Sequence, residues 1–328
     1  MSDMSRRRFI KESILASAAG VVAAKVEGQN AAPQGNRRTI PPISCIPLLF
    51  FPDMLQTRTM SVEDWIRMAS KLGLDGIEMY EPYLTNWKTD YLSRLSDTVH
   101  NAGLAVSMFT SYADFSNADP PIRTAQVSNV KRAVNAAVAF KTNIVRITAG
   151  RWIDGISIDK TLNNVAGGIK ECLDYAESRG VMLALEDHPE VGTQITHFMR
   201  ILELVGDHRL KVNLDTSNPM VSGDNAVDLV ELVKDRVVHV HASDRNKDLG
   251  HTVAGTGAVD FPGIFTILKR AGFAGWVSLE AGGTKGEESI RQGMEYIKRT
   301  WGSVSGAHSH AKRNTAGGRN YEPEDIWG

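Results

Sequence analysis

The sequence predicts a single (β/α)8 TIM barrel over residues 42–301. From Pro42 onward, a short β-prone run followed by a loop and an amphipathic helical pattern recurs eight times. These units occupy residues 40–301, close to the roughly 250 residues of such a barrel. Four successive late β-prone runs also end on an ionisable side chain, and barrel enzymes place their sites at these strand ends. A doubly wound open sheet would alternate in the same way, but no Gly-x-Gly-x-x-Gly motif follows the first run, so the barrel is favoured.

Residues 1–32 precede the barrel and are predicted to be an export signal. Ser5-Arg-Arg-Arg-Phe-Ile-Lys11 stands before a mildly apolar stretch, residues 13–24, and then small residues. The stretch is too short and too weakly hydrophobic for a stable membrane anchor of about 20 apolar residues. A basic start, an apolar middle and a small-residue end are typical of export signals, and this one resembles the twin-arginine (Tat) type. The resemblance implies that the Tat export machinery recognises the precursor and that the protein is periplasmic or otherwise exported.

The elements follow in order after a polar linker at residues 33–41. Strands are expected at 43–51, 75–80, 104–109, 143–148, 181–186, 210–214, 237–241 and 276–280. Helices are expected at 61–72, 89–102, 120–140, 160–179, 193–204, 223–235, 260–271 and 286–301. Helix N-caps are predicted at Ser61, Asp159, Thr193, Asp224 and Asp260. Glycines are expected just past helix ends at Gly73, Gly103, Gly180 and Gly272.

Composition limits the class of partner. The 328 residues are 42% hydrophobic and carry a formal net charge of −1, so there is no electrostatic case for nucleic acid or an anionic membrane. Cys45 and Cys172 are 127 positions apart in apolar segments, which predicts two free thiols. Residues 302–328 have no apolar period and are predicted to form a polar C-terminal tail. Barrels of this kind often form homo-oligomers, although no interface can be recognised in the sequence.

The late strands carry the chemistry. Strand 5 ends at Glu186, strand 6 at Asp215, strand 7 at His241 and strand 8 at Glu280. One such residue alone is commonly a helix cap or a solvated loop residue, but four on successive strands predict a shared site. Three carboxylates and one imidazole suit a hard or borderline ion such as Mn²⁺, Mg²⁺, Co²⁺ or Zn²⁺. His239 shares a strand face with His241, so one of the two could be only a hydrogen-bonded core histidine.

These residues lie in motifs that resemble the sugar-phosphate isomerase/epimerase group of xylose-isomerase-like TIM barrels. The resemblance implies one divalent cation, most often manganese, held by Glu186, Asp215, His241 and Glu280, with the two glutamates acting as acid and base. Such a pair suits proton transfer next to a carbonyl, because an ion can stabilise the enediolate charge while two carboxylates move the proton. The most specific motifs are Leu185-Glu-Asp-His188, Asn213-Leu-Asp-Thr-Ser-Asn218, His239-Val-His-Ala-Ser-Asp244 and Val277-Ser-Leu-Glu280.

Five further residues are candidates for substrate contact. His188 lies two positions after Glu186 and could bind a hydroxyl or orient a ligand. Glu78 and Arg146 are charged residues in strands 2 and 4, where a charge must be paired, with each other or with substrate. Asp244 could orient an imidazole. Lys247 stands where ketose 3-epimerases of the group carry an arginine, and Gly192 stands where they carry a carboxylate. The resemblance therefore implies the metal chemistry of the group more strongly than its specificity for ketoses.

The leading hypothesis is a metal-dependent isomerase or epimerase of a sugar. A lyase that eliminates the glycosidic oxygen of a 3-keto sugar would begin with the same proton abstraction. An apurinic endonuclease of the same superfamily would need additional early histidines, and none precedes His100. A non-catalytic sugar-binding barrel would not need all four ligands. The loop Ala281-Gly-Gly-Thr-Lys-Gly286 could hold a phosphate, but Glu287 and Glu288 would repel one. An unphosphorylated sugar or glycoside is therefore expected.

Overall fold

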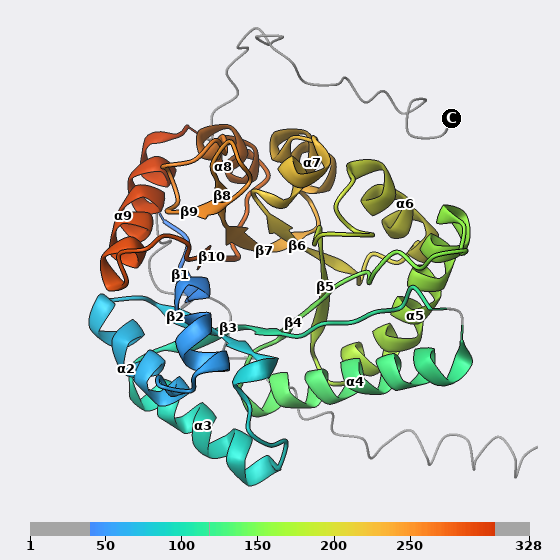
Figure 1. Cartoon of the computed structure of the whole chain (residues 1–328), viewed down its shortest axis with the longest axis horizontal. Helices are drawn as coiled ribbons and strands as arrows, with labels where there is room; N and C mark the ends of the chain where they lie inside the picture. Colours follow the sequence, from blue (N-terminus) through green and yellow to red (C-terminus); the bar gives the residue numbers. More distant parts are fainter. Residues whose placement is uncertain (1–39, 118, 306–328) are drawn as a thin grey trace, which may run out of the picture.

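The computed structural model describes residues 40–117 and 119–305. Eight parallel strands form one sheet in the order β1-β10-β7-β6-β5-β4-β3-β2, and β1 also lies beside β2. The sheet therefore curls into a nearly closed barrel with helices around it (Figure 1). The predicted TIM barrel is confirmed. The predicted export signal and almost all of the linker and C-terminal tail lie outside the described residues.

The strands of the barrel are short and their carboxyl ends lie at one face. They are β1 (Ile43–Ile46), β2 (Gly76–Tyr80), β3 (Ala105–Thr110), β4 (Ile144–Ile147), β5 (Met182–Glu186), β6 (Lys211–Asp215), β7 (Val237–Ala242) and β10 (Trp276–Glu280). The helices are α2 (Val62–Leu72), α3 (Thr89–Asn101), α4 (Pro120–Ala139), α5 (Ile158–Ser178), α6 (Ile195–Val205), α7 (Ala226–Val233), α8 (Phe261–Arg270) and α9 (Glu287–Ser303).

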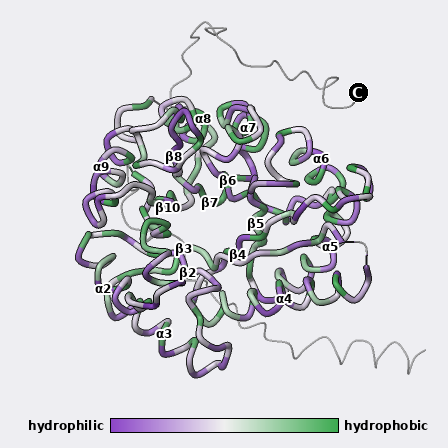
Figure 2. The backbone as a smooth tube through the Cα atoms, viewed as in Figure 1, coloured by the Kyte–Doolittle hydropathy of each residue, from purple (hydrophilic) through white to green (hydrophobic). Residues whose placement is uncertain are grey.

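Helix α2 illustrates why these segments are helical and how they cover the barrel. The Ser61 hydroxyl accepts a hydrogen bond from the Asp64 N–H at 3.1 Å, and the Asp64 carboxylate accepts one from the Ser61 N–H at 2.9 Å. This capping box satisfies two N–H groups at the helix start, and Gly73 ends the helix at a φ of 76°. Trp65 and Ile66 are buried against the sheet. Hydrophobic and hydrophilic residues alternate along the helices in the same way (Figure 2).

The first strand is shorter than predicted. The sequence favoured a strand over 43–51, but β1 ends at Ile46, and two short helical turns, Leu48–Phe50 and Pro52–Gln56, follow it. Pro47 and Pro52 lack the N–H that a strand needs and fix φ near −65°, which favours these turns. The apolar run between the prolines resembled a strand only in composition.

Several helix starts also differ from the predictions. The N-caps of α5, α6 and α7 are Ser157, Gln194 and Asn225. Asp224 was predicted to cap α7, but its carboxylate accepts a hydrogen bond from the Ile195 N–H at 3.0 Å and so satisfies the start of α6. A two-stranded hairpin, β8 (Asp244–Arg245) with β9 (His251–Thr252), was not predicted. Within the described residues, no helix combines the length and apolar character needed to cross a membrane.

The inward-facing side chains change character along the strands. Met108, Ile144 and Ala184 form a small apolar cluster of their own. Two residues further along the same strands, Thr110, Arg146 and Glu186 occupy the next layer, because alternate residues of a strand share a face. The side chains inside the barrel are therefore polar or ionisable near the carboxyl ends of the strands, and the candidate site begins there.

Candidate metal centre and active site

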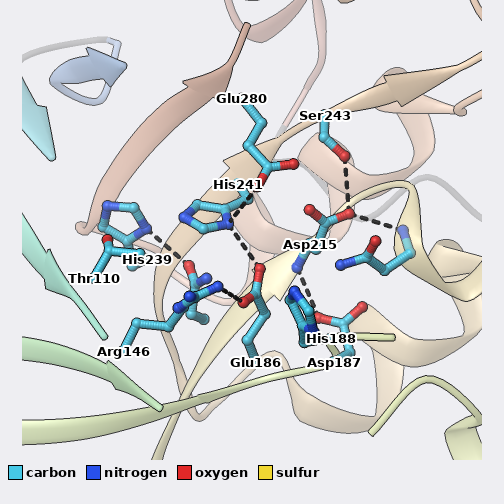
Figure 3. A network of polar contacts seen from close by, with 12 residues as sticks. Thr110, Arg146, Glu186, Asp187, His188, Asp215, His239, His241, Ser243 and Glu280 are labelled. Carbon is cyan, nitrogen blue, oxygen red and sulfur yellow. Dashed lines mark hydrogen bonds and ion pairs between the residues drawn. The ribbon is translucent and has the colours of Figure 1, made fainter. Parts of the chain in front are cut away.

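The structure brings the four predicted ligands together. Glu186 ends β5, Asp215 ends β6, His241 lies near the end of β7 and Glu280 ends β10. One ligand atom from each lies within 4.8 Å of all the others, so the group could hold a metal ion. Three of the side chains are fully buried and that of Glu280 is 13% exposed. Figure 3 shows Glu186, Asp215, His241 and Glu280 approaching one another from neighbouring strands.

His241 has a carboxylate at each ring nitrogen. Its Nδ1 lies 2.8 Å from Glu186 Oε1 and 3.6 Å from Glu280 Oε1, and its Nε2 lies 3.1 Å from Glu78 Oε1. Burial alone would lower the pKa of His241, but Glu78 and Glu186 raise it well above its usual value. Nδ1 therefore faces the other three ligands, while Nε2 is engaged by Glu78 on the opposite side.

Arg146 distinguishes Glu186 from the other carboxylates. Its guanidinium forms an ion pair with Glu186, donates from Nε to the Ser111 carbonyl at 3.2 Å and lies 4.3 Å from the centre of the Tyr112 ring. Burial would raise the pKa of Glu186, but Arg146 and His241 together lower it below its usual value. Glu186 is therefore held ionised and oriented although no solvent reaches it.

Asp215 is fixed by hydrogen bonds that leave one oxygen unused. Its Oδ1 accepts from the Ser217 N–H at 2.7 Å, the Asn218 N–H at 2.8 Å and the Ser243 hydroxyl at 2.9 Å. Its own N–H donates to Asp187 Oδ1 at 2.7 Å. Oδ2 is buried and has no hydrogen-bond partner. A buried carboxylate oxygen without a donor is costly, and a cation bound there would satisfy it.

Glu280 stands in an acidic environment. Burial raises its pKa well above the usual value, and the charges of Asp215 and Glu186 add to this effect although His241 opposes it. Three convergent carboxylates and an imidazole nitrogen form the oxygen-rich donor set preferred by Mn²⁺, Mg²⁺ or Zn²⁺. The residues present thus fit a divalent cation in both donor chemistry and charge.

Below this group, Glu78, His239 and His241 form a second cluster with metal-ligand side chains. Hydrogen bonds already engage its members: His239 Nδ1 donates to Asn213 Oδ1 at 2.8 Å, and Thr110 donates to Glu78. Burial lowers the pKa of His239 to about 3, so its imidazole is neutral. His239 is the hydrogen-bonded core histidine that the sequence allowed for one of the pair.

The remaining predicted substrate contacts occupy different environments. Glu78 pairs with His241 rather than with Arg146 and is fully buried, a position that does not support direct substrate contact. The Asp244 carboxylate orients no imidazole; it accepts from the N–H groups of Arg245, Gly255, Gly257 and Val259. Lys247 is exposed at the tip of the β8–β9 hairpin. His188 packs edge-on against Tyr112, with 5.5 Å between ring centres, and lies beside the site.

Two residues of the site were missed by sequence reasoning. Tyr112 covers Arg146, and Asp187 holds the backbone of Asp215. Asp187 stands next to Glu186 in the sequence, so its place beside the site could have been inferred. Tyr112 follows β3 by two residues, and nothing in its local pattern separates it from any loop aromatic.

The fold and the site together define a TIM barrel with a candidate metal centre at the carboxyl ends of its strands. The xylose isomerase-like TIM barrel family matches residues 66–300, and the chain belongs to this family.

Several known proteins are similar to this chain in sequence. An inosose dehydratase of Clostridium botulinum (strain Alaska E43 / Type E3) is 29% identical over 153 residues, which are 41% of this chain and 50% of that protein. The chain thus matches about half the length of that relative. An uncharacterized protein of Methanocaldococcus jannaschii is 23% identical over 270 residues, covering 76% of this chain and 88% of that one.

Solved structures with the same fold include an L-ribulose 3-epimerase, with a TM-score of 0.67 and 17% identity over 80% of this chain and 95% of that one. They also include the probable 3-DHS dehydratase AsbF of Bacillus anthracis, with a TM-score of 0.64 and 18% identity over 79% of this chain and 98% of that one. At these identities the likeness establishes the fold alone.

Proposed function

We propose that the protein is a divalent-metal-dependent enzyme that moves a proton at the carbon next to a carbonyl of a sugar, as an isomerase or epimerase. The observation that carries this proposal is the convergence of Glu186, Asp215, His241 and Glu280 at the carboxyl ends of four strands. An L-ribulose 3-epimerase and a D-psicose 3-epimerase share the fold, which supports a small sugar as substrate.

Glu186, Asp215, Glu280 and Nδ1 of His241 would hold the ion, for which Mn²⁺ is our first choice. When bound, such an ion supplies Lewis-acid stabilisation of the negative charge that develops on the substrate oxygen. It would also satisfy the unpartnered Oδ2 of Asp215.

The chain's own residues then carry the proton. Glu186 and Glu280 come from β5 and β10 and would act on the substrate carbon as base and acid, one removing the proton and the other returning it. Arg146 holds one oxygen of Glu186, which fixes the direction in which the other can act. Because Glu280 is the one partly exposed ligand among the four, it lies nearest the side from which substrate enters.

A second candidate is β-elimination, the lyase outcome. The same base would remove the proton next to the carbonyl, the bond from the adjacent carbon to its oxygen substituent would break, and the acid would protonate the leaving oxygen. Inosose dehydratases among the relatives and a 3-DHS dehydratase among the structural neighbours favour this alternative. The two candidates share every residue role and differ in where the second proton goes.

We also propose that the protein acts outside the cytoplasm, after export by the twin-arginine route. The basis is residues 1–32, which lie outside the described residues. Processing of this segment in cells, with loss of export when Arg6 and Arg7 are replaced by Lys, is the expected result. A cytoplasmic full-length chain would contradict it.

A deuterium-exchange experiment tests the function. The chain is loaded with Mn²⁺ and incubated in D₂O with ketohexoses, inososes and 3-keto glucosides, and carbon-bound deuterium and products are followed by NMR and mass spectrometry. We expect deuterium to replace the proton next to the carbonyl in one substrate class, with the exchange lost in Glu280→Gln. A product that differs from the substrate only by the incorporated deuterium then indicates an epimerase, and a product that has lost water or an alcohol indicates a lyase. Absence of bound metal from the wild-type chain after addition of divalent ions would overturn the proposal.

A further inference from the structure

Beside the metal ligands lies a separate polar pocket of about 420 Å³. Its walls come from the loops after β3, β4 and β5 and from one face of α4, and they include Tyr112, Asp114, Asn129, Arg151 and His188. The pocket therefore lies over the β3–β4 part of the barrel, whereas three of the four metal ligands come from β6, β7 and β10 (Figure 1). We propose that this pocket binds the part of the substrate that is not transformed, and that the substrate is a glycoside of at least two rings. This inference rests on the proposed function and names its substrate class.

The pocket is connected to the metal site through one layer of side chains. Tyr112 lines the pocket, and the guanidinium of Arg146 lies 4.3 Å from the centre of its ring. Arg146 in turn forms the ion pair with Glu186. His188 lines the pocket as well, and it follows Glu186 by two positions. A substrate whose reacting ring contacts Glu186 and Glu280 can therefore place its next ring in this pocket.

The lining has the chemistry of a sugar subsite. Tyr112 is 45% exposed and offers an aromatic face, which suits the C–H face of a pyranose ring. Around it stand side-chain donors and acceptors, among them Gln126, Asn129 and His188. Ligand pockets commonly combine such an aromatic wall with a few placed polar groups.

The charges in the pocket are paired, which selects against an ionic ligand. Arg151 Nε lies 3.3 Å from Asp114 Oδ2, and Arg132 lies 3.4 Å from Glu81 Oε1. Of the lining residues, Arg151 and Asp114 thus compensate each other and Glu81 is compensated by Arg132 from outside the lining, which disfavours a phosphate or an ammonium group. A neutral polyhydroxyl group is the ligand that this arrangement favours.

The walls are also held in place without ligand. The Ala113 N–H donates to the Thr148 hydroxyl at 3.1 Å, and this hydroxyl donates to the Ala113 carbonyl at 2.7 Å. Gly150 has a φ of 115°, and a Cβ there would lie 2.2 Å from Asp114 Oδ1, so only glycine allows the two loops to approach this closely. A preformed pocket costs little ordering on binding.

Calorimetric titration tests the proposal without requiring turnover. The ligands are α- and β-linked gluco-disaccharides, the corresponding methyl glucosides, and glucose 6-phosphate, each with and without Mn²⁺. The blocking variant is Asn129→Phe, which fills the pocket from α4. The matched control is Ser128→Phe, the neighbouring position, which is exposed and does not line the pocket.

We expect at least one disaccharide to bind the wild-type chain about tenfold or more tightly than its methyl glucoside, an advantage of about 1.4 kcal/mol. This advantage should disappear in Asn129→Phe and persist in Ser128→Phe. Equal binding of disaccharides and methyl glucosides, an advantage that survives Asn129→Phe, or tighter binding of glucose 6-phosphate would each overturn the proposal. Because binding is measured directly, such a failure is separate from a failure to exchange deuterium.

Discussion

At the scale of single residues, Glu78 determines how His241 can act. Its carboxylate lies 3.1 Å from His241 Nε2, which leaves Nδ1 directed towards Glu186 and Glu280. Carboxylates that hold the second nitrogen of a metal-binding histidine fix its tautomer and raise its basicity. Glu78 is thus a positioning residue rather than one that touches substrate.

Glu78→Gln should therefore weaken metal binding while leaving the four ligands in place. The amide still accepts a hydrogen bond but carries no charge, so we expect the Mn²⁺ dissociation constant to rise about 10- to 100-fold. Competition with a chelating dye measures it. Glu288→Gln, an exposed carboxylate on α9, is the matched control. An unchanged dissociation constant in Glu78→Gln would remove Glu78 from this role.

Arg146 compensates the buried charge of Glu186, and its loss should affect stability. Arg146→Met removes the ion-pair partner of that buried carboxylate and leaves it only the contact with His241, which is expected to cost about 3–5 kcal/mol of unfolding free energy. Arg146→Lys keeps the charge but loses the planar fork and the contact with Tyr112, so it should cost less while still reducing kcat. Urea denaturation of the three proteins gives the values. Equal losses of unfolding free energy in Arg146→Met and Arg146→Lys would show that the charge of Arg146 is not what stabilises Glu186.

Residues of the site differ in how far they could be predicted. Glu186, Asp215, His241 and Glu280 end successive apolar runs, so the regular spacing of a barrel identifies them together. Glu78 comes to His241 across 163 positions, and which nitrogen it contacts depends on side-chain geometry that no local pattern contains. The same holds for Tyr112, whose importance arises only from its place over Arg146.

At the scale of elements, the loop that contains the β8–β9 hairpin is built around one carboxylate. Asp244 accepts hydrogen bonds from four backbone N–H groups, including those of Gly255 and Gly257 at 2.8 and 2.9 Å. A Cβ at Gly257 would lie 2.2 Å from Asp244 Oδ1, so the close approach requires glycine.

Asp244→Ala should release this loop without unfolding the barrel. The four N–H groups belong to exposed or half-buried residues and can bond to water instead, so the loop loses its fixed conformation and we expect faster proteolytic cleavage within residues 246–258. Asp248→Ala, at the exposed tip of the same loop, is the control. If the two variants are cleaved at the same rate, Asp244 is not what holds the loop.

A pH-dependent link joins α5 to the loop before β6. Arg209 contacts Asp174 and Glu177 of α5 and donates to Asp207, and hydrogen bonds from Arg209 lower the pKa of Asp207 to about 2. The folded pKa lies below the unfolded value of about 3.9. The stabilisation is therefore present above about pH 4 and is lost as the pH falls towards 2.

Asp207→Asn should accordingly lower stability at pH 7, by less than about 1 kcal/mol because solvent screens the pair. The difference from wild type should shrink between pH 4 and pH 3 in urea titrations. Asp235→Asn, an exposed aspartate between α7 and β7, provides the comparison. A difference that grows as the pH falls would have the wrong sign for this mechanism.

Several element boundaries differ from those that the sequence predicts, for identifiable physical reasons. The apolar run from Pro47 to Pro52 has strand composition, but its prolines cannot join a ladder. Asp224 has the right chemistry for an N-cap, and it caps α6 rather than the helix that follows it. Local chemistry predicts that a cap is needed but does not say which of two neighbouring helices receives it.

At the scale of the whole molecule, the barrel topology is what makes the site. Glu186 and Glu280 are 94 positions apart, yet both approach His241 Nδ1 because parallel strands end at one face. This convergence could be predicted, since it depends only on element order. The polar pocket over β3 and β4 could not, because its walls depend on the exact approach of three loops.

The convergence also makes metal binding a contribution to global stability. With Mn²⁺ at about 100 times its dissociation constant, the wild-type chain should gain about 2.7 kcal/mol, and chelation should reverse this gain. Glu280→Gln should be at least as stable as wild type in chelator, because it removes one of three neighbouring carboxylates. In Mn²⁺ it should be less stable, because it removes a ligand.

The order of the two proteins is therefore expected to reverse between chelator and Mn²⁺. Thermal or urea denaturation under both conditions measures it. Glu288→Gln should follow wild type throughout, since its charge is exposed on α9. A general weakening of the fold by Glu280→Gln would lower stability in both conditions, and an adventitious ion bound elsewhere would raise both proteins equally. Only a cation held between Glu280 and its three partners produces opposite signs.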